Sequence, residues 1–115
     1  MIRLTCMLRR KAGMSREEFH DHWINVHGPL IARSKSGSYV LRYEQHPRTN
    51  YPEVDDGGFD GVTVQWFATM EDYEASLMAE DFGEMWADIE SFLDTSQLHF
   101  VLTEEPRLVI NKIDQ

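Results

Sequence analysis

Three histidines and a tryptophan occur within eight residues near the start of this 115-residue sequence. They are His20, His22, Trp23 and His27. An imidazole titrates near neutral pH, so it can both take up and return a proton. His27 is the strongest candidate for a general acid or base, because it directly precedes Gly28-Pro29, where a helix is expected to kink or stop. The alternative interpretation is that His27 has a structural role only, donating a hydrogen bond to a backbone carbonyl left without a partner at the helix break.

The helix that carries these residues has a clear start. Ser15 with Glu18 three positions later predicts a capping box. If this helix ends near His27, its dipole favours the protonated imidazole and raises the pKa of His27. On a regular helix, His20 and His22 point to nearly opposite sides. We therefore expect no metal site, a surface position for His20, and for His22 a weaker place as a substrate-binding residue.

Hydrophobic periodicity predicts the remaining elements. Residues 2–9, 39–43, 62–66 and 98–102 alternate as strands do, and helices are expected after residues 69 and 81. The order β-α-β-β-α-β is the ferredoxin-like arrangement, an α+β fold with an antiparallel sheet and both helices on one face. Residues 1–115 are expected to form one domain. The segment from His46 to Gly58 is predicted to be a long loop.

The alternation also predicts which side chains share a face of the sheet. Tyr39, Leu41 and Tyr43 are expected on one face of the second strand, and Val62, Val64 and Trp66 on one face of the third. The face away from the helices is then expected to hold Arg3, Thr5, Met7, Arg42, Thr63, Gln65, Phe67, His99 and Val101. This mixture is too apolar for a fully solvated surface, so we expect a homodimer in which the two sheets cover one another.

Further candidates for a site lie on the second and third strands. The phenol of Tyr43 can bond a substrate oxygen, and Asp60 can orient His27 or bond the ligand. Trp23 and Trp66 are candidate substrate-binding residues, since either can stack on a flat ligand or simply pack in the core. The acidic stretch from Asp55 to Asp60 lacks the ligand periodicity of a calcium loop and is interpreted as a solvated loop.

Composition excludes several functions. A net charge of −9, from 20 acidic and 11 basic residues, argues against binding to nucleic acid or an anionic membrane. Neither a phosphate loop nor a dinucleotide motif is present, so no cofactor is expected. The single cysteine, Cys6, is predicted to be a small buried hydrophobic residue. With no signal-peptide pattern at the start, the expected location is the cytoplasm.

The motif around the histidines is similar to that of a known family. Phe19-x3-Trp23-x3-His27-Gly-Pro-Leu30, preceded by Arg9-Arg10-Lys11-x-Gly13-x-Ser15, resembles the EthD family of dimeric α+β barrel proteins. Asp60-Gly61-Val62 followed by Trp66-Phe67 resembles the same family's central strand, whereas the loop 47–58 has no counterpart that we can match. The resemblance implies a homodimeric barrel of two four-stranded sheets, with a cleft between sheet and helices in each protomer.

The resemblance and the candidate residues together predict a cofactor-free enzyme acting on a small hydrophobic aromatic or polyketide-like molecule. His27 would remove a proton next to a carbonyl, while Tyr43 or Asp60 holds the oxygen on which charge develops. Dehydration, cyclisation or decarboxylation can follow. Two alternatives stay open: a cofactor-free oxygenase, and a non-catalytic metabolite-binding or accessory protein of a degradation pathway.

Overall fold

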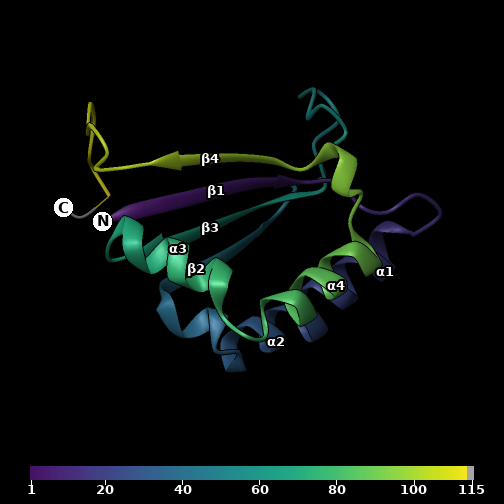
Figure 1. Ribbon diagram of the computed structural model, residues 1–115. Coiled ribbons are helices and arrows are strands. Elements are labelled where there is room, and N and C mark those ends of the chain that lie inside the picture. Colours follow the sequence, from purple (N-terminus) through teal and green to yellow (C-terminus); the bar gives the residue numbers. More distant parts are fainter. Residues whose placement is uncertain (114–115) are drawn as a thin grey trace.

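The computed structural model describes residues 1–113, in which a four-stranded antiparallel sheet carries all its helices on one face (Figure 1). The strands are β1 (Ile2–Leu8), β2 (Val40–Pro47), β3 (Gly61–Phe67) and β4 (His99–Thr103). Their order in the sheet is β2-β3-β1-β4, with every neighbouring pair antiparallel. The predicted α+β, ferredoxin-like fold class is therefore confirmed.

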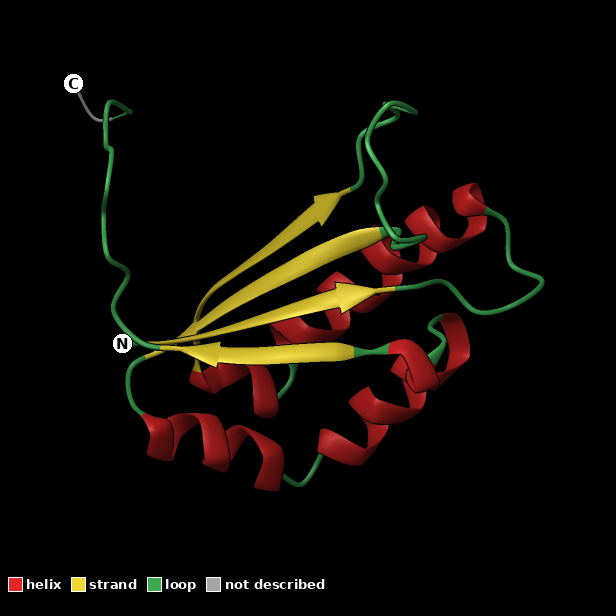
Figure 2. Cartoon of the chain, turned by 90° about the horizontal axis from the view of Figure 1, so that it is seen from above, coloured by secondary structure: helices red, strands yellow, loops and turns green. Residues whose placement is uncertain are grey.

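The helices that follow Ser15, Thr69 and Asp81 begin where the sequence predicts. The helices are α1 (Arg16–His22), α2 (Gly28–Arg33), α3 (Met70–Met78) and α4 (Phe82–Phe92), with short helical turns η1 (Trp23–His27), η2 (Ser36–Tyr39) and η3 (Thr95–Gln97). The Ser15 hydroxyl accepts the Glu18 backbone N–H at 3.0 Å, and the Thr69 hydroxyl accepts that of Asp72 at 3.1 Å. Figure 2 shows the four strands side by side above these helices. No helix within residues 1–113 has the length and apolar character needed to cross a membrane.

The helix does not stop at His27, so of the two predicted outcomes, a kink or an end, the end is wrong. α1 runs through the π-helical turn η1 directly into α2, and Gly28 has helical dihedral angles, φ −56° and ψ −53°. The Gly28 N–H bonds the carbonyl of Trp23 five residues back. Pro29 then falls in the first turn of α2, where its missing N–H is tolerated. The wider turn thus lets the chain continue past a proline that would otherwise break a helix.

A bulge changes the expected faces of β2. The register shifts between Val40 and Arg42, so Val40 and Tyr43 face the helices together. Leu41 is 60 % exposed, not paired with Tyr43 on the inner face as its spacing predicts. The predicted alternation fails here because the extra residue reverses the phase of the strand.

The faces of β3 are also the reverse of those predicted. Thr63, Gln65 and Phe67 point toward the helices, while Val62, Val64 and Trp66 lie on the opposite face. The error arises because a simple apolar–polar alternation assigns polar residues to the solvent-facing side of a strand, and here polar residues lie on the inner face. Two buried clusters surround this region on the helix side, one around Phe19, Trp23 and Phe92, the other around Ile2, Leu4 and Phe67.

Candidate active site

A cavity of about 280 Å³ lies between the sheet and the helices, bordered by both core clusters. Its walls are mostly apolar and come from all four strands as well as from α2, α3 and α4. Its polar side chains are few: His27, Ser36, Tyr43, Thr63, Gln65, Tyr73 and Ser76. The Ser36 and Ser76 hydroxyls donate to backbone carbonyls at 2.7 and 2.6 Å. An apolar cavity of this size with a few convergent polar groups is typical of a site for a small molecule.

His27 is buried at the wall of this cavity, 5 % exposed, and Asp88 of α4 holds it in place. The distance from His27 Nδ1 to Asp88 Oδ2 is 2.7 Å. A carboxylate only accepts hydrogen bonds, so a neutral His27 bonded to it carries its proton on Nδ1. Nε2 is then the ring nitrogen left for a ligand, with its lone pair available. This arrangement suits a general base.

The same carboxylate also holds His22. The distance from His22 Nε2 to Asp88 Oδ1 is 2.9 Å, and the ring of Phe92 packs against both imidazoles, with centroids 4.7 Å from His22 and 5.0 Å from His27. On a regular helix two residues five apart lie far round the axis from each other. The π turn, whose hydrogen bonds span five residues, brings His22 and His27 onto the same side. Sequence spacing alone pairs His20 with His27, so it missed this arrangement.

The direction of the His27 pKa shift also differs from the prediction. Burial is the largest effect and lowers the pKa of His27 below 6.5, against the opposing effect of the hydrogen bond and negative charge of Asp88. The expected upward shift required a helix end at His27, and the continuous helix provides none. His27 is therefore predominantly neutral at pH 7, which is the form that a general base needs.

Tyr43 faces the cavity from β2. Burial raises the pKa of Tyr43 to about 12, although the side chains of Gln45 and Trp23 act in the opposite direction. Gln45 Nε2 donates to the Trp23 carbonyl at 2.8 Å, the same carbonyl that receives the π-turn hydrogen bond. Trp23 Nε1 lies buried beside the Tyr43 hydroxyl but lacks the geometry of a formed hydrogen bond. Tyr43 is thus a neutral phenol that can donate to a ligand oxygen.

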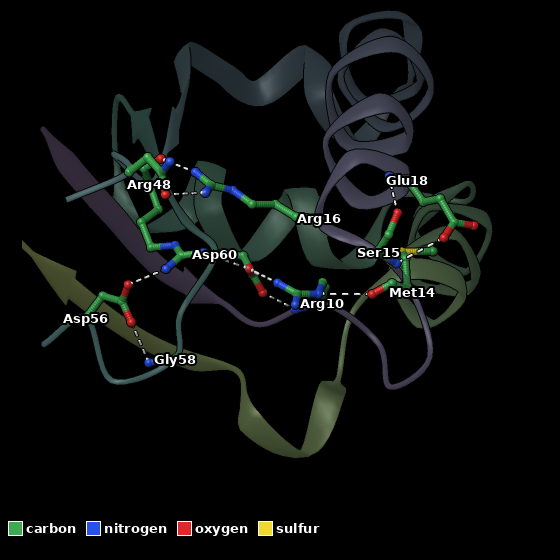
Figure 3. A network of polar contacts seen from close by, with 10 residues as sticks. Arg10, Met14, Ser15, Arg16, Glu18, Arg48, Asp56, Gly58 and Asp60 are labelled. Atoms are coloured by element: carbon green, nitrogen blue, oxygen red, sulfur yellow. Dashed lines mark hydrogen bonds and ion pairs between the residues drawn. The ribbon is translucent and has the colours of Figure 1, made fainter. Parts of the chain in front are cut away.

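Asp60 lies outside the cavity, so the expectation that it orients His27 is wrong. Its side chain is 2 % exposed and accepts from the Arg10 backbone N–H at 2.9 Å and from the Arg10 guanidinium (Figure 3). The guanidinium of Arg48 lies 3.9 Å away and also pairs with Asp56 at 2.5 Å. Asp60 therefore fastens the long loop to the end of β1, while Asp88 takes the position beside His27. The loop 47–60 contributes no residue to the cavity wall.

The other sequence candidates are divided between the cavity and other surfaces. Trp23, 0 % exposed, is both core and cavity wall. Trp66 does not reach the cavity, because its ring lies between the guanidinium groups of Arg3 and Arg42, at 5.2 and 5.4 Å, on the opposite face of the sheet. His20 is only half-buried and packs on the ring of Phe19, with centroids 5.5 Å apart.

Asp88 is the residue that sequence reasoning missed. It falls between Met85 and Phe92 on the buried stripe of α4, at the helical spacing of apolar residues. A single carboxylate on such a stripe requires a partner, which was the available clue. Residues 1–113 contain no group of three His, Cys, Asp or Glu side chains arranged to hold a metal ion.

The fold and this site together define a class: ferredoxin-like α+β domains with an apolar cavity between the sheet and the helices. Within this class the chain belongs to the EthD family, because the EthD domain model matches residues 11–96. The resemblance predicted from the sequence is thereby confirmed. No curated protein matches the sequence.

Solved structures share the fold at low sequence identity. An EthD family protein from Bacillus halodurans is 15 % identical, with 92 % of this chain and 99 % of that chain covered and a TM-score of 0.74. A dimeric ferredoxin-like protein from Thermobifida fusca is also 15 % identical, covering 90 % of each chain at a TM-score of 0.68. SnoaB, a cofactor-independent oxygenase from Streptomyces nogalater, is 8 % identical, with 96 % of this chain and 97 % of that chain covered and a TM-score of 0.66.

Proposed function

We propose that this protein is a cofactor-free enzyme that removes a proton next to a carbonyl group of a small hydrophobic aromatic or polyketide-like molecule. The observation that carries the proposal is His27, buried at the cavity wall with Nδ1 bonded to Asp88 and Nε2 left for the ligand. A buried imidazole oriented by a carboxylate is the arrangement that makes histidine an effective base.

The chemistry follows from the two sides of the cavity. His27 Nε2 takes the proton from carbon, and the electrons of the broken C–H bond move onto the neighbouring carbonyl oxygen as an enolate. The resulting imidazolium keeps its Nδ1–H on Asp88, whose negative charge stabilises it. Tyr43 donates to the oxygen that gains charge, a role supported by its neutral phenol within the cavity. Dehydration, ring closure or decarboxylation can each proceed through such an intermediate.

The cavity also limits the size of the substrate. A volume of about 280 Å³ lies near the lower limit for ligand pockets, roughly 300 Å³. Aromatic and aliphatic walls such as Trp23, Phe67, Met85 and Trp86 favour a flat apolar molecule with few polar groups. We therefore propose one or two fused rings, with the acidic C–H directed at His27 Nε2 and the carbonyl oxygen at the Tyr43 hydroxyl.

The test is a ligand screen with turnover as the second readout. Wild type, His27→Ala and the control His46→Ala are screened by thermal shift against phenols, quinones and lactones, and bound compounds are then incubated and analysed by mass spectrometry. His46 is a matched control because it also pairs with a carboxylate, Glu44, but its side chain is 54 % exposed and outside the cavity. A compound consumed by wild type and His46→Ala, and bound but left unchanged by His27→Ala, supports the proposal. Equal binding without turnover in all three proteins contradicts it and indicates a binding protein.

A second candidate function is a cofactor-free oxygenase, in which the same enolate or phenolate reacts with dioxygen. The observation that favours it is the shared fold of SnoaB, itself a cofactor-independent oxygenase. Oxygen consumption during turnover, measured with an oxygen electrode, separates the two functions. Stoichiometric uptake favours the oxygenase, and turnover under anaerobic conditions favours the lyase or cyclase.

We also propose that the protein is a homodimer that acts in the cytoplasm. The sheet face opposite the helices carries Val62, Val64 and Trp66, and beside them Met7 and Val101 are 38 % and 55 % exposed. Dimeric relatives of the same fold support a sheet-to-sheet dimer as the cover for this face. Light scattering at micromolar concentration tests the dimer, and a monomer there would contradict it.

A further inference from the structure

His22 shares a carboxylate with the candidate base and yet belongs to a different environment. Its side chain is 26 % exposed, whereas that of His27 is 6 % exposed and that of Asp88 is 15 % exposed. Asp88 uses a different oxygen for each ring, Oδ1 for His22 at 2.9 Å and Oδ2 for His27 at 2.7 Å. The three side chains therefore form one His–Asp–His unit that reaches from partly solvated His22 to the cavity.

We propose that His22 is a positioning residue that takes the first proton from solvent and so keeps the cavity-facing His27 neutral. This inference rests on the proposed function, since it concerns how the proposed base is held ready. A single carboxylate balances one positive charge, and a proton on either ring disfavours a second proton on the other. The positive charge is better tolerated at His22, because a partly solvated imidazolium avoids most of the desolvation that a buried one suffers.

The electrostatic surroundings support this division of roles. Burial and the charge of His22 both lower the pKa of His27, with burial the larger effect, while Asp88 acts in the opposite direction. Cys6 from β1 and Tyr43 from β2 face the same cavity, and burial raises the pKa of each to about 12. Both are neutral across the range in which histidines titrate, so they add no charge. The remaining carboxylates of α4, Glu84 and Glu90, are exposed.

Geometry gives His22 a second effect on the site. With Oδ1 engaged by His22, the Asp88 carboxylate is fixed with Oδ2 toward His27. The Ser91 hydroxyl lies 3.5 Å from His22 Nε2 and donates to the Asp88 carbonyl at 2.5 Å. The Phe92 ring, itself part of the core, packs against both imidazoles. A neutral donor at position 22 should therefore keep the carboxylate in place while abolishing the charge coupling.

The experiment is a titration of the histidine rings by ¹H–¹⁵N NMR on the ¹⁵N-labelled protein, without any substrate. It compares wild type, His22→Gln, His22→Leu and the control His46→Gln. In wild type we expect His27 as the Nδ1–H tautomer, and protonation of His22 before His27 as the pH falls. In His22→Gln the Nδ1–H tautomer of His27 should persist, and the pH midpoint of His27 protonation should move to higher pH, because the competing positive charge is gone. In His46→Gln this midpoint should not move.

The outcomes are decisive without an identified ligand. If His27 is protonated before His22, or if its midpoint stays in place or falls in His22→Gln, the inference is overturned. His22→Leu separates the two effects, since it abolishes both the charge and the donor: only this variant should also weaken the Nδ1–H preference of His27. Should coupling be present while no compound is turned over, the inference stands and the proposed function fails. With a compound that the enzyme turns over, the acid limb of the pH profile of kcat/KM should move to higher pH in His22→Gln.

Discussion

Gly61→Ala should destabilise the fold by overpacking one side chain, Trp23. A Cβ atom added at Gly61 would meet Cη2 of Trp23 at 2.6 Å and Cζ3 at 2.8 Å, whereas carbon atoms in contact ordinarily lie about 3.5–4.0 Å apart. The indole must therefore retreat by about 1 Å. It has little room, because it is 0 % exposed and its centroid lies 5.2 Å from that of Phe19. Overpacking of a core costs roughly 1–3 kcal/mol, and we expect the upper half of that range.

The strand offers no easy relief at this position. Gly61 pairs with Leu8 on β1 and with Pro47 on β2, so its backbone is held from both sides. At roughly 4 °C per kcal/mol for a domain of this size, the melting temperature should fall by about 8–12 °C. Urea denaturation gives the free energy of unfolding directly. Gly83→Ala is the matched control: a Cβ there meets nothing within 4 Å, so this helical position should be neutral or slightly stabilised.

A double-mutant cycle with Trp23→Phe identifies the cause. Phenylalanine lacks the two indole carbons that a Cβ at position 61 would strike, so Gly61→Ala should cost less in that background, where only the tight 3.1 Å contact with the His46 carbonyl oxygen remains. The coupling energy should therefore be the larger part of the cost of the single substitution. Equal costs in the two backgrounds, within about 0.5 kcal/mol, would refute the reasoning, since distant or unrelated sites are additive to that extent. The cost would then have to arise from the backbone of β3.

Three further perturbations test separate parts of the structure. Because the pKa of His27 is lowered on folding, the unfolded state binds more protons near and below pH 6.5. The free energy of unfolding should therefore fall as the pH drops through this range, and it should fall less in His27→Gln. Urea denaturation at a series of pH values measures both. Asp60→Asn leaves Arg10 without its buried counter-charge and should cost roughly 1–3 kcal/mol, while ligand affinity in the cavity, measured by calorimetry, stays unchanged. Gly37→Ala would place Cβ 2.0 Å from the Ile31 carbonyl oxygen, so by thermal melting it should destabilise more than Gly61→Ala, since the obstacle is backbone.

The parts of the fold that the sequence predicts are those controlled by neighbouring residues. Ser15 with Glu18 and Thr69 with Asp72 close their capping contacts within one turn, so the spacing alone is sufficient. β1 alternates regularly because its inner residues are apolar and its neighbours are regular strands. The order of the elements then restricts the chain to a small number of topologies.

The site depends on contacts between distant residues, which local spacing cannot show. The π turn is bonded by Gln45, 22 residues from Trp23, and Asp88 lies 61 residues from His27. A regular helix therefore predicted the wrong pair of histidines, and the search for a carboxylate partner led to Asp60. His27 and Tyr43 were placed correctly at the cavity, although their catalytic roles stay predictions until turnover is measured.

Three departures from regular local structure border the cavity. The π turn places His27 at its wall, the bulge of β2 places Tyr43 there, and β3 directs Thr63 and Gln65 inward where apolar residues would pack better. Each departs from the local pattern, and each forfeits some stability that a regular, apolar element would provide. Independent irregularities arising by drift have no reason to border the same space. Their convergence is the pattern expected if the cavity holds the proposed ligand, since functional sites are where a sequence departs from regular local structure.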